Sequence, residues 1–193
     1  MDLRQQRTRR SLVNAFLALR TKKPIEKITV RELAEQAQIH KATFYLHYHD
    51  IYELSEQLEY EVIDDIFSGL SDPTELLTNM QRFNEELYTL LVSHESLLGI
   101  LFSGSRAGIL AEMLEKRLKT YIFELHPEYR EDLEYNVVLT YLIHGAYRAY
   151  MQYRDREPKE ILLIINTVAS SVLRQYTGEA PQAKELPEEA PAE

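Results

Sequence analysis

The sequence predicts an all-α protein, and two observations support this. Only six of the 193 residues are glycine, and no stretch alternates apolar and polar residues for long enough to form a strand. Apolar residues recur instead with helical spacing, and at 45% of the chain they suffice for a core. We expect a three-helix head over residues 1–49, a larger helical domain over 50–178, and a disordered acidic tail over 179–193.

The first helix is expected over about residues 2–19, and Pro24 ends the segment. Arginines crowd its first half, where the helix dipole disfavours positive charge. They are Arg4, Arg7, Arg9 and Arg10. Phosphate groups would offset this cost, so this half of the helix is a candidate anion-binding surface.

Two short helices follow, and a tight turn separates them. Thr29 and Glu32 form a capping box at the start of the second helix, in which hydroxyl and carboxylate each accept from a free backbone N–H. Gln38 and Ile39 make the turn, and a short third helix, KATFYLHY, covers about residues 41–48.

The remaining helices are longer, and capping boxes or prolines mark several of their ends. Their predicted ranges are 50–67, 72–93, a short helix before a break at Ser103-Gly104, a helix ending at about Leu125, then 127–154 and 158–176.

Charge is divided unevenly along the chain. Residues 1–50 hold ten Lys/Arg and five Asp/Glu, a net of +5, although the whole chain carries −9. This asymmetry suggests that one surface faces a polyanion. The lack of cysteine excludes disulfides and thiolate metal sites. Because no apolar run is long enough for a membrane span and no secretory signal is apparent, we expect a soluble cytoplasmic protein with no membrane partner.

The head has the features of a helix-turn-helix. The major groove of DNA admits one helix, and the preceding helix crosses the backbone and braces it. Phe44 is expected to pack on Leu33 and Phe16. The face opposite Phe44 would carry Lys41, Thr43, Tyr45 and His47.

The stretch ITVRELAEQAQIHKATFYLHYHDIYEL resembles the DNA-binding head of TetR/AcrR-type transcriptional regulators. The resemblance covers about residues 5–55 and implies a homodimeric repressor on a palindromic duplex operator, released by a small-molecule effector. It also implies contacts to DNA phosphates from Thr29, Thr43, Tyr45 and His47. By the same resemblance, base edges would be read by Arg31, Lys41 and Ala42.

Three residues depart from the family pattern. Gln38 stands where glycine is usual, so a positive φ there would cost more than it does for glycine. His40 replaces a serine-like cap, which leaves the third helix less well capped. Ile51 replaces a common lysine and removes one expected phosphate contact.

The rest of the chain shows no catalytic motif, and we expect neither an enzyme nor a cofactor nor a metal site. Glu-x-x-His is absent, and Ser103-Gly104-Ser105 lacks the G-x-S-x-G frame. Polar and aromatic residues near apolar stripes are candidates for an effector pocket. They are Phe83, Tyr88, Phe102, Tyr121, Tyr141 and His144.

The last two helices carry more apolar residues than one small domain needs to bury. We therefore expect a four-helix interface between two subunits. Its predicted residues are Leu139, Ile143, Ala146, Tyr150, Leu162, Ile165, Val168, Ala169 and Val172. Two alternatives stay open: a regulator whose body docks a protein partner, and a helical ligand-binding protein or enzyme with a vestigial head.

Overall fold

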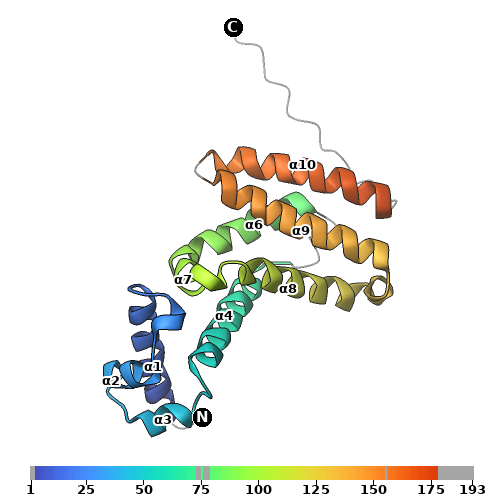
Figure 1. The fold of residues 1–193 in the computed structure, drawn as a ribbon. Coiled ribbons are helices and arrows are strands. Elements are labelled where there is room, and N and C mark those ends of the chain that lie inside the picture. Colours follow the sequence, from blue (N-terminus) through green and yellow to red (C-terminus); the bar gives the residue numbers. More distant parts are fainter. Residues whose placement is uncertain (1–2, 73–74, 76–78, 155, 178–193) are drawn as a thin grey trace.

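The computed structural model describes residues 3–72, 75, 79–154 and 156–177, and within them the protein is all-α, as predicted (Figure 1). Short 3-10 helices, η1 (Ile25–Lys27), η2 (Gly104–Arg106) and η3 (Pro127–Arg130), lie between the main elements. These elements are α1 (Leu3–Arg20), α2 (Val30–Gln36), α3 (Lys41–Tyr45), α4 (Ile51–Ser68), α6 (Met80–Ser93), α7 (Glu95–Leu101), α8 (Ile109–Leu125), α9 (Leu133–Tyr153) and α10 (Pro158–Thr177). The tail over 179–193 lies outside the described residues.

Helices α1–α3 lie at one end of the molecule and α10 lies at the other (Figure 1). Helix α4 leads from α3 toward the larger part, where it packs against α6, α7 and α8. Helix α9 packs between α8 and α10, and α10 also packs against α6. The arrangement therefore separates the basic N-terminal helices from the α9–α10 pair.

No single helix in the described part of the chain is both long and apolar enough to cross a membrane. One pair, Glu95–Leu101 with Gly104–Leu125, meets the length and composition criterion only when combined, and it is bent by 108°.

Side-chain caps set several helix starts where the sequence predicts them. The Thr29 hydroxyl accepts from the Glu32 N–H at 3.2 Å, and the Asp50 carboxylate accepts from the Glu53 N–H at 2.8 Å. The Glu32 carboxylate, which the capping box predicts to accept from a free backbone N–H, accepts from the Lys23 ammonium at 2.7 Å. This contact connects α2 to the segment after α1.

Two predicted helices differ from the structure. Within the helix expected over 72–93, Glu75 is helical and Asn79 is not, and α6 begins at Met80, where the Asn79 side chain accepts from the Arg82 N–H; residues 73–74 and 76–78 lie outside the described residues. The helix expected over 127–154 is divided into η3 and α9. The Asp132 carboxylate caps α9 by accepting from the Tyr135 N–H at 3.0 Å, and the Asn136 side-chain amide donates to three carbonyls of the turn before α9. These are the carbonyls of Tyr129, Arg130 and Asp132.

A continuous apolar core runs from α1 through α4 to α8. In its N-terminal part, Leu12, Phe16, Leu33 and Phe44 are completely buried. This confirms that Phe44 is directed into the protein with Phe16 and Leu33 in the same core cluster. The other side of α3 is consequently left facing outward.

Candidate nucleic-acid interface and apolar cavity

Helix α3 is short and is held by one aromatic anchor. Phe44 is 0% exposed, and its ring lies 5.4 Å from the Tyr45 ring and 5.7 Å from the buried Tyr48 ring, between centroids. His40 precedes α3 without a side-chain capping hydrogen bond, as the sequence predicts. The helix ends at Tyr45 and not near residue 48, because Leu46 and His47 form a turn.

The side chains expected to contact DNA gather on α2, α3 and the segment before α2. Thr29, Arg31, Lys41, Ala42 and Tyr45 are exposed. The other two predicted contacts, Thr43 and His47, are partly buried. This surface combines hydroxyls, two cations and an aromatic edge, and it lies at the end of the molecule farthest from α10 (Figure 1).

Both candidate base-reading cations have local partners. The Arg31 guanidinium donates to the Glu35 carboxylate at 2.9 Å, and this hydrogen bond raises the pKa of Arg31. The Lys41 ammonium lies 6.0 Å from the centre of the Tyr45 ring, a cation–π distance. Since these partners are on the surface, both interactions contribute little to stability.

The turn between α2 and α3 has a left-handed backbone at Gln38, where the sequence analysis expects a positive φ to cost more than it does for glycine. Gln38 has φ 56°. Its N–H donates to the Glu35 carbonyl at 3.2 Å, and the next N–H, of Ile39, donates to the Ala34 carbonyl at 3.0 Å. These two bonds form a Schellman motif, which usually has glycine at the position of Gln38. The turn thus keeps its geometry with a residue that pays a steric cost.

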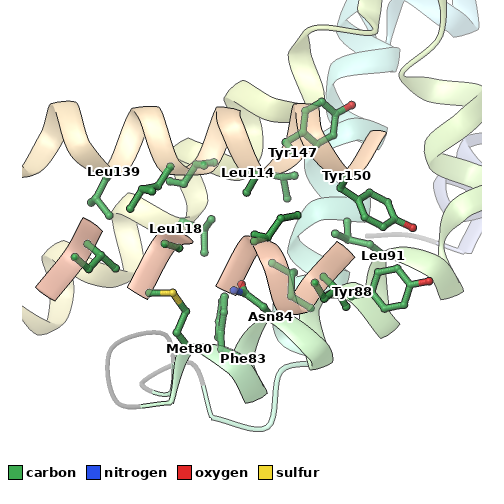
Figure 2. Close-up of a pocket in the computed structure, with 18 of the residues that line it drawn as sticks. Met80, Phe83, Asn84, Tyr88, Leu91, Leu114, Leu118, Leu139, Tyr147 and Tyr150 are labelled. Atoms are coloured by element: carbon green, nitrogen blue, oxygen red, sulfur yellow. The ribbon is translucent and has the colours of Figure 1, made fainter. Parts of the chain in front are cut away.

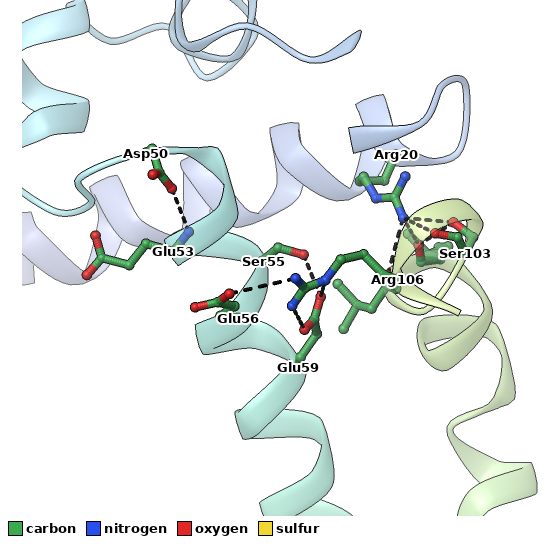
Figure 3. Close-up of polar contacts among 10 residues, drawn as sticks. Arg20, Asp50, Glu53, Ser55, Glu56, Glu59, Ser103 and Arg106 are labelled. Carbon is green, nitrogen blue, oxygen red and sulfur yellow. Dashed lines mark hydrogen bonds and ion pairs between the residues drawn. The ribbon is translucent and has the colours of Figure 1, made fainter. Parts of the chain in front are cut away.

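A buried arginine joins the N-terminal helices to the larger part of the protein (Figure 3). Arg20, at the end of α1, is 5% exposed, and burial lowers its pKa. Its guanidinium donates to the carbonyls of Ile100 and Leu101 at 3.0 and 3.2 Å and to the Ser103 hydroxyl at 2.8 Å. The cation therefore sits at the C-terminus of α7, where the helix dipole favours it.

A second buried contact fixes α4 to the same region (Figure 3). The Glu59 carboxylate is 1% exposed and accepts from the Arg106 guanidinium at 2.9 Å and from the Ser55 hydroxyl at 2.7 Å. The hydrogen bond to Glu59 raises the pKa of Arg106. Arg9 on α1 also pairs with Glu61 on α4, so this arginine is engaged within the protein.

Helices α6, α8, α9 and α10 surround an apolar cavity of about 180 Å³ (Figure 2). The two predicted pocket residues that line it are Phe83 and Tyr88. The other four predicted pocket residues lie elsewhere. Phe102 is buried in the main core, Tyr121 stacks on Phe67, Tyr141 is 71% exposed, and His144 binds Glu115 at 2.8 Å.

Most residues predicted for a subunit interface also face this cavity within one chain. Val168 and Val172 do not line it, and Val168 is exposed while Val172 is partly buried. The residues that do line it are Leu139, Ile143, Ala146, Tyr150, Leu162, Ile165 and Ala169. The predicted apolar stripes are therefore directed inward, because α6 and α8 cover them from the same chain.

Exposed apolar side chains occupy the other faces of α9 and α10. They are Leu133, Val137 and Tyr141 on α9, and Leu163, Ile164 and Val168 on α10. Each is more than half exposed. A spacing of four residues places Leu133, Val137 and Tyr141 along one side of α9, and it does the same for Ile164 and Val168 on α10, with Leu163 beside Ile164. Such rows are unusual on a monomer surface and mark a candidate interaction face.

The sequence analysis missed Arg20, the Arg106–Glu59 pair, and the amide pair of Asn84 and Asn166 that joins α6 to α10. A single arginine or asparagine in a helical pattern carries no local sign that it is buried.

No group of three or more His, Asp or Glu residues in the described ranges is placed to hold a metal ion. Comparison with family models, with curated proteins and with solved structures gave no match.

Proposed function

We propose that the protein is a homodimeric DNA-binding transcriptional regulator, a repressor of the TetR type that a small-molecule effector releases from a palindromic operator. The observation that carries the proposal is α3, a short helix anchored by Phe44 with Lys41, Ala42 and Tyr45 exposed on its outer side. This is the division of faces that a recognition helix needs. The positive charge of residues 1–50 supports it.

Dimerisation would use the outer faces of α9 and α10 in place of the inward stripes. The exposed rows that include Val137 and Ile164 are the apolar surface that a second copy would cover. Helices α9 and α10 lie at the end of the molecule away from α3 (Figure 1), so a two-fold axis beside them leaves both α3 helices free for two half-sites.

The cavity supports a small-molecule effector over a docked protein partner. The cavity lies among α6, α8, α9 and α10. The Arg20 hydrogen bonds join α1, in the part that would bind DNA, to the end of α7, in the part that holds the cavity. A ligand would release DNA by binding better to the form of the protein that cannot span two half-sites.

The deciding experiment is selection of bound duplexes from random DNA, followed by affinity measurement on the selected site. Lys41→Ala should relax the preference at one base step, at a cost of about 1–3 kcal/mol. Tyr45→Phe and Thr43→Ala should weaken binding about equally on all sequences. Lys116→Ala, which removes an exposed cation from α8, is the control.

Affinity for the selected site should also fall steeply with salt, through release of counterions from DNA phosphates. The proposal would be refuted if no sequence were enriched, or if wild type and Lys41→Ala selected the same site with the same affinity.

A further inference from the structure

The lining of the cavity among α6, α8, α9 and α10 is free of charge. No lysine, arginine, histidine or carboxylate is among the described residues that line it. The lining residues with polar side chains are Asn84 and four tyrosines. These tyrosines are Tyr88, Tyr135, Tyr147 and Tyr150. Figure 2 shows the hydroxyls of Tyr88, Tyr147 and Tyr150 directed away from the other lining side chains. An ion that entered would lose its hydration without gaining a charged partner, which is strongly unfavourable.

Three of these tyrosines, Tyr135, Tyr147 and Tyr150, do not provide a charge at any pH near neutrality. Burial raises the pKa of Tyr135 to about 12. Burial, assisted by a hydrogen bond with Tyr88, also raises the pKa of Tyr150 to about 12. Burial raises the pKa of Tyr147 as well. These hydroxyls therefore stay neutral and act only as hydrogen-bonding groups.

The cavity is long, and the Asn84 amide is a polar point within its apolar wall. Its wall follows α6 from Met80 to Leu91, a length of roughly 16 Å at the rise of an α-helix. Figure 2 shows the Asn84 side chain between its neighbours on this wall. The Asn84 amide donates to Asn166, which is 6% exposed, so the side chain is held in place and its own carbonyl can accept from a ligand.

We propose that this cavity binds an uncharged, elongated apolar molecule with a single hydroxyl-like group, and that it rejects carboxylate or ammonium analogues of the same length. The Asn84 amide would receive the hydroxyl, and the leucine and isoleucine side chains would cover the chain. The claim about ligand class stands on the cavity alone, whereas its regulatory consequence, release of DNA, rests on the proposed function.

The test is calorimetric titration of the full chain, without DNA, with three probes of one length: 1-octanol, octanoate and octylammonium. We expect 1-octanol to bind at least tenfold more tightly than either ion. Ala146→Leu fills the cavity and should weaken octanol binding at least tenfold. Ala107→Leu makes the same change at an exposed position outside the cavity, and it should leave binding unchanged.

Asn84→Leu is a second variant, which keeps the test decisive if Ala146→Leu fails to fold. It removes the polar point and should weaken octanol binding severalfold. Binding of octanoate or octylammonium as tight as that of 1-octanol would overturn the inference, and so would no binding of 1-octanol. Failure to enrich any DNA site would refute the proposed function alone, because these titrations contain no DNA.

Discussion

The two ends of the molecule differ in how closely their side chains pack. In α1–α3, completely buried side chains such as Leu12, Phe16 and Phe44 close the core although α2 and α3 have only 7 and 5 residues. Helices α6, α8, α9 and α10 have 14 to 21 residues, yet they enclose a cavity of about 180 Å³ and expose apolar rows.

The difference indicates where each part obtains its stability. A helix of one or two turns is unstable in isolation, so α2 depends on its contacts with α1, and α3 depends on its contacts with α2. The long helices can tolerate unfilled space and uncovered surface. A ligand needs unfilled space, and a second subunit needs uncovered apolar surface. The looser packing therefore lies at the end of the molecule that is the candidate for regulation.

The largest expected effect is the loss of the anchor of α3. Phe44→Ala should destabilise the protein by about 3–5 kcal/mol, because it removes a completely buried ring and leaves a cavity. Tyr45→Ala, one residue later and 52% exposed, should change stability by less than about 0.5 kcal/mol. Urea unfolding of both variants measures the contrast. Similar losses would show that the two faces of α3 are not distinct.

Arg20 connects the two ends, and its removal is expected to have the next largest effect. Arg20→Ala leaves buried carbonyls at the end of α7 without their donor and should cost about 3 kcal/mol. Arg10→Ala removes an exposed arginine from the same helix and should cost less than about 0.5 kcal/mol. Equal small losses in urea unfolding would mean that Arg20 does not hold α1 against α7.

A third prediction concerns pH and the contact between α8 and α9. Burial disfavours the ionised Glu115, but hydrogen bonds from Lys119, Thr140 and His144 outweigh it and lower the pKa of Glu115 to about 2. A lowered folded-state pKa stabilises the protein fully above the normal value of 4.5, and this contribution is lost as pH falls toward about 2.

Replacing the carboxylate tests the same contact. Glu115→Gln should cost about 2 kcal/mol at pH 7, since it removes charged hydrogen bonds, and should reduce the loss of stability between pH 4.5 and 2. Glu112→Gln, on the same helix, is the control. Identical pH profiles for wild type and Glu115→Gln, measured by thermal unfolding, would contradict the assignment.

Enlarging alanines compares the packing of the two ends directly. Ala15→Leu, in the filled core around α1, should destabilise the protein by about 2 kcal/mol through overpacking. Ala146→Leu extends into the cavity and should be neutral or stabilise by up to about 1 kcal/mol. If Ala146→Leu were as destabilising as Ala15→Leu in urea unfolding, the larger part would be as tightly packed as α1–α3.

Local signals account for what the sequence predicts well. The caps at Thr29 and Asp50 depend on residues three positions apart, so they can be recognised without the tertiary fold. The inward position of Phe44 follows from helical periodicity in the same way. The break before α9 was missed although Asp132 caps α9 with the same spacing of three residues, because the earlier Pro127 also signals a helix start.

A local sequence pattern does not show which helix covers an apolar stripe. Periodicity correctly shows that Leu139 and Ala169 share buried faces of their helices, but it does not show whether the cover comes from the same chain or another. The sequence predicts these two for a subunit interface, and within one chain they line the cavity. Arg20 was missed for a related reason, since only the approach of α7, eighty residues later, makes it buried.

The smallest expected effect lies in the turn that orients α3. Gln38 has φ 56°, a backbone conformation that costs an L-residue about 1–2 kcal/mol. Glycine has no such steric cost, but its larger loss of chain entropy on folding costs about 0.5–1 kcal/mol. Gln38→Gly should therefore stabilise the protein by about 0.5 kcal/mol. Gln36→Gly, two residues earlier in α2, has no such strain to relieve and should destabilise by about 0.5–1 kcal/mol. Opposite signs in urea unfolding would locate the cost in the backbone of the turn, whereas destabilisation by both variants would show that the Gln38 side chain contributes more than its strained φ costs.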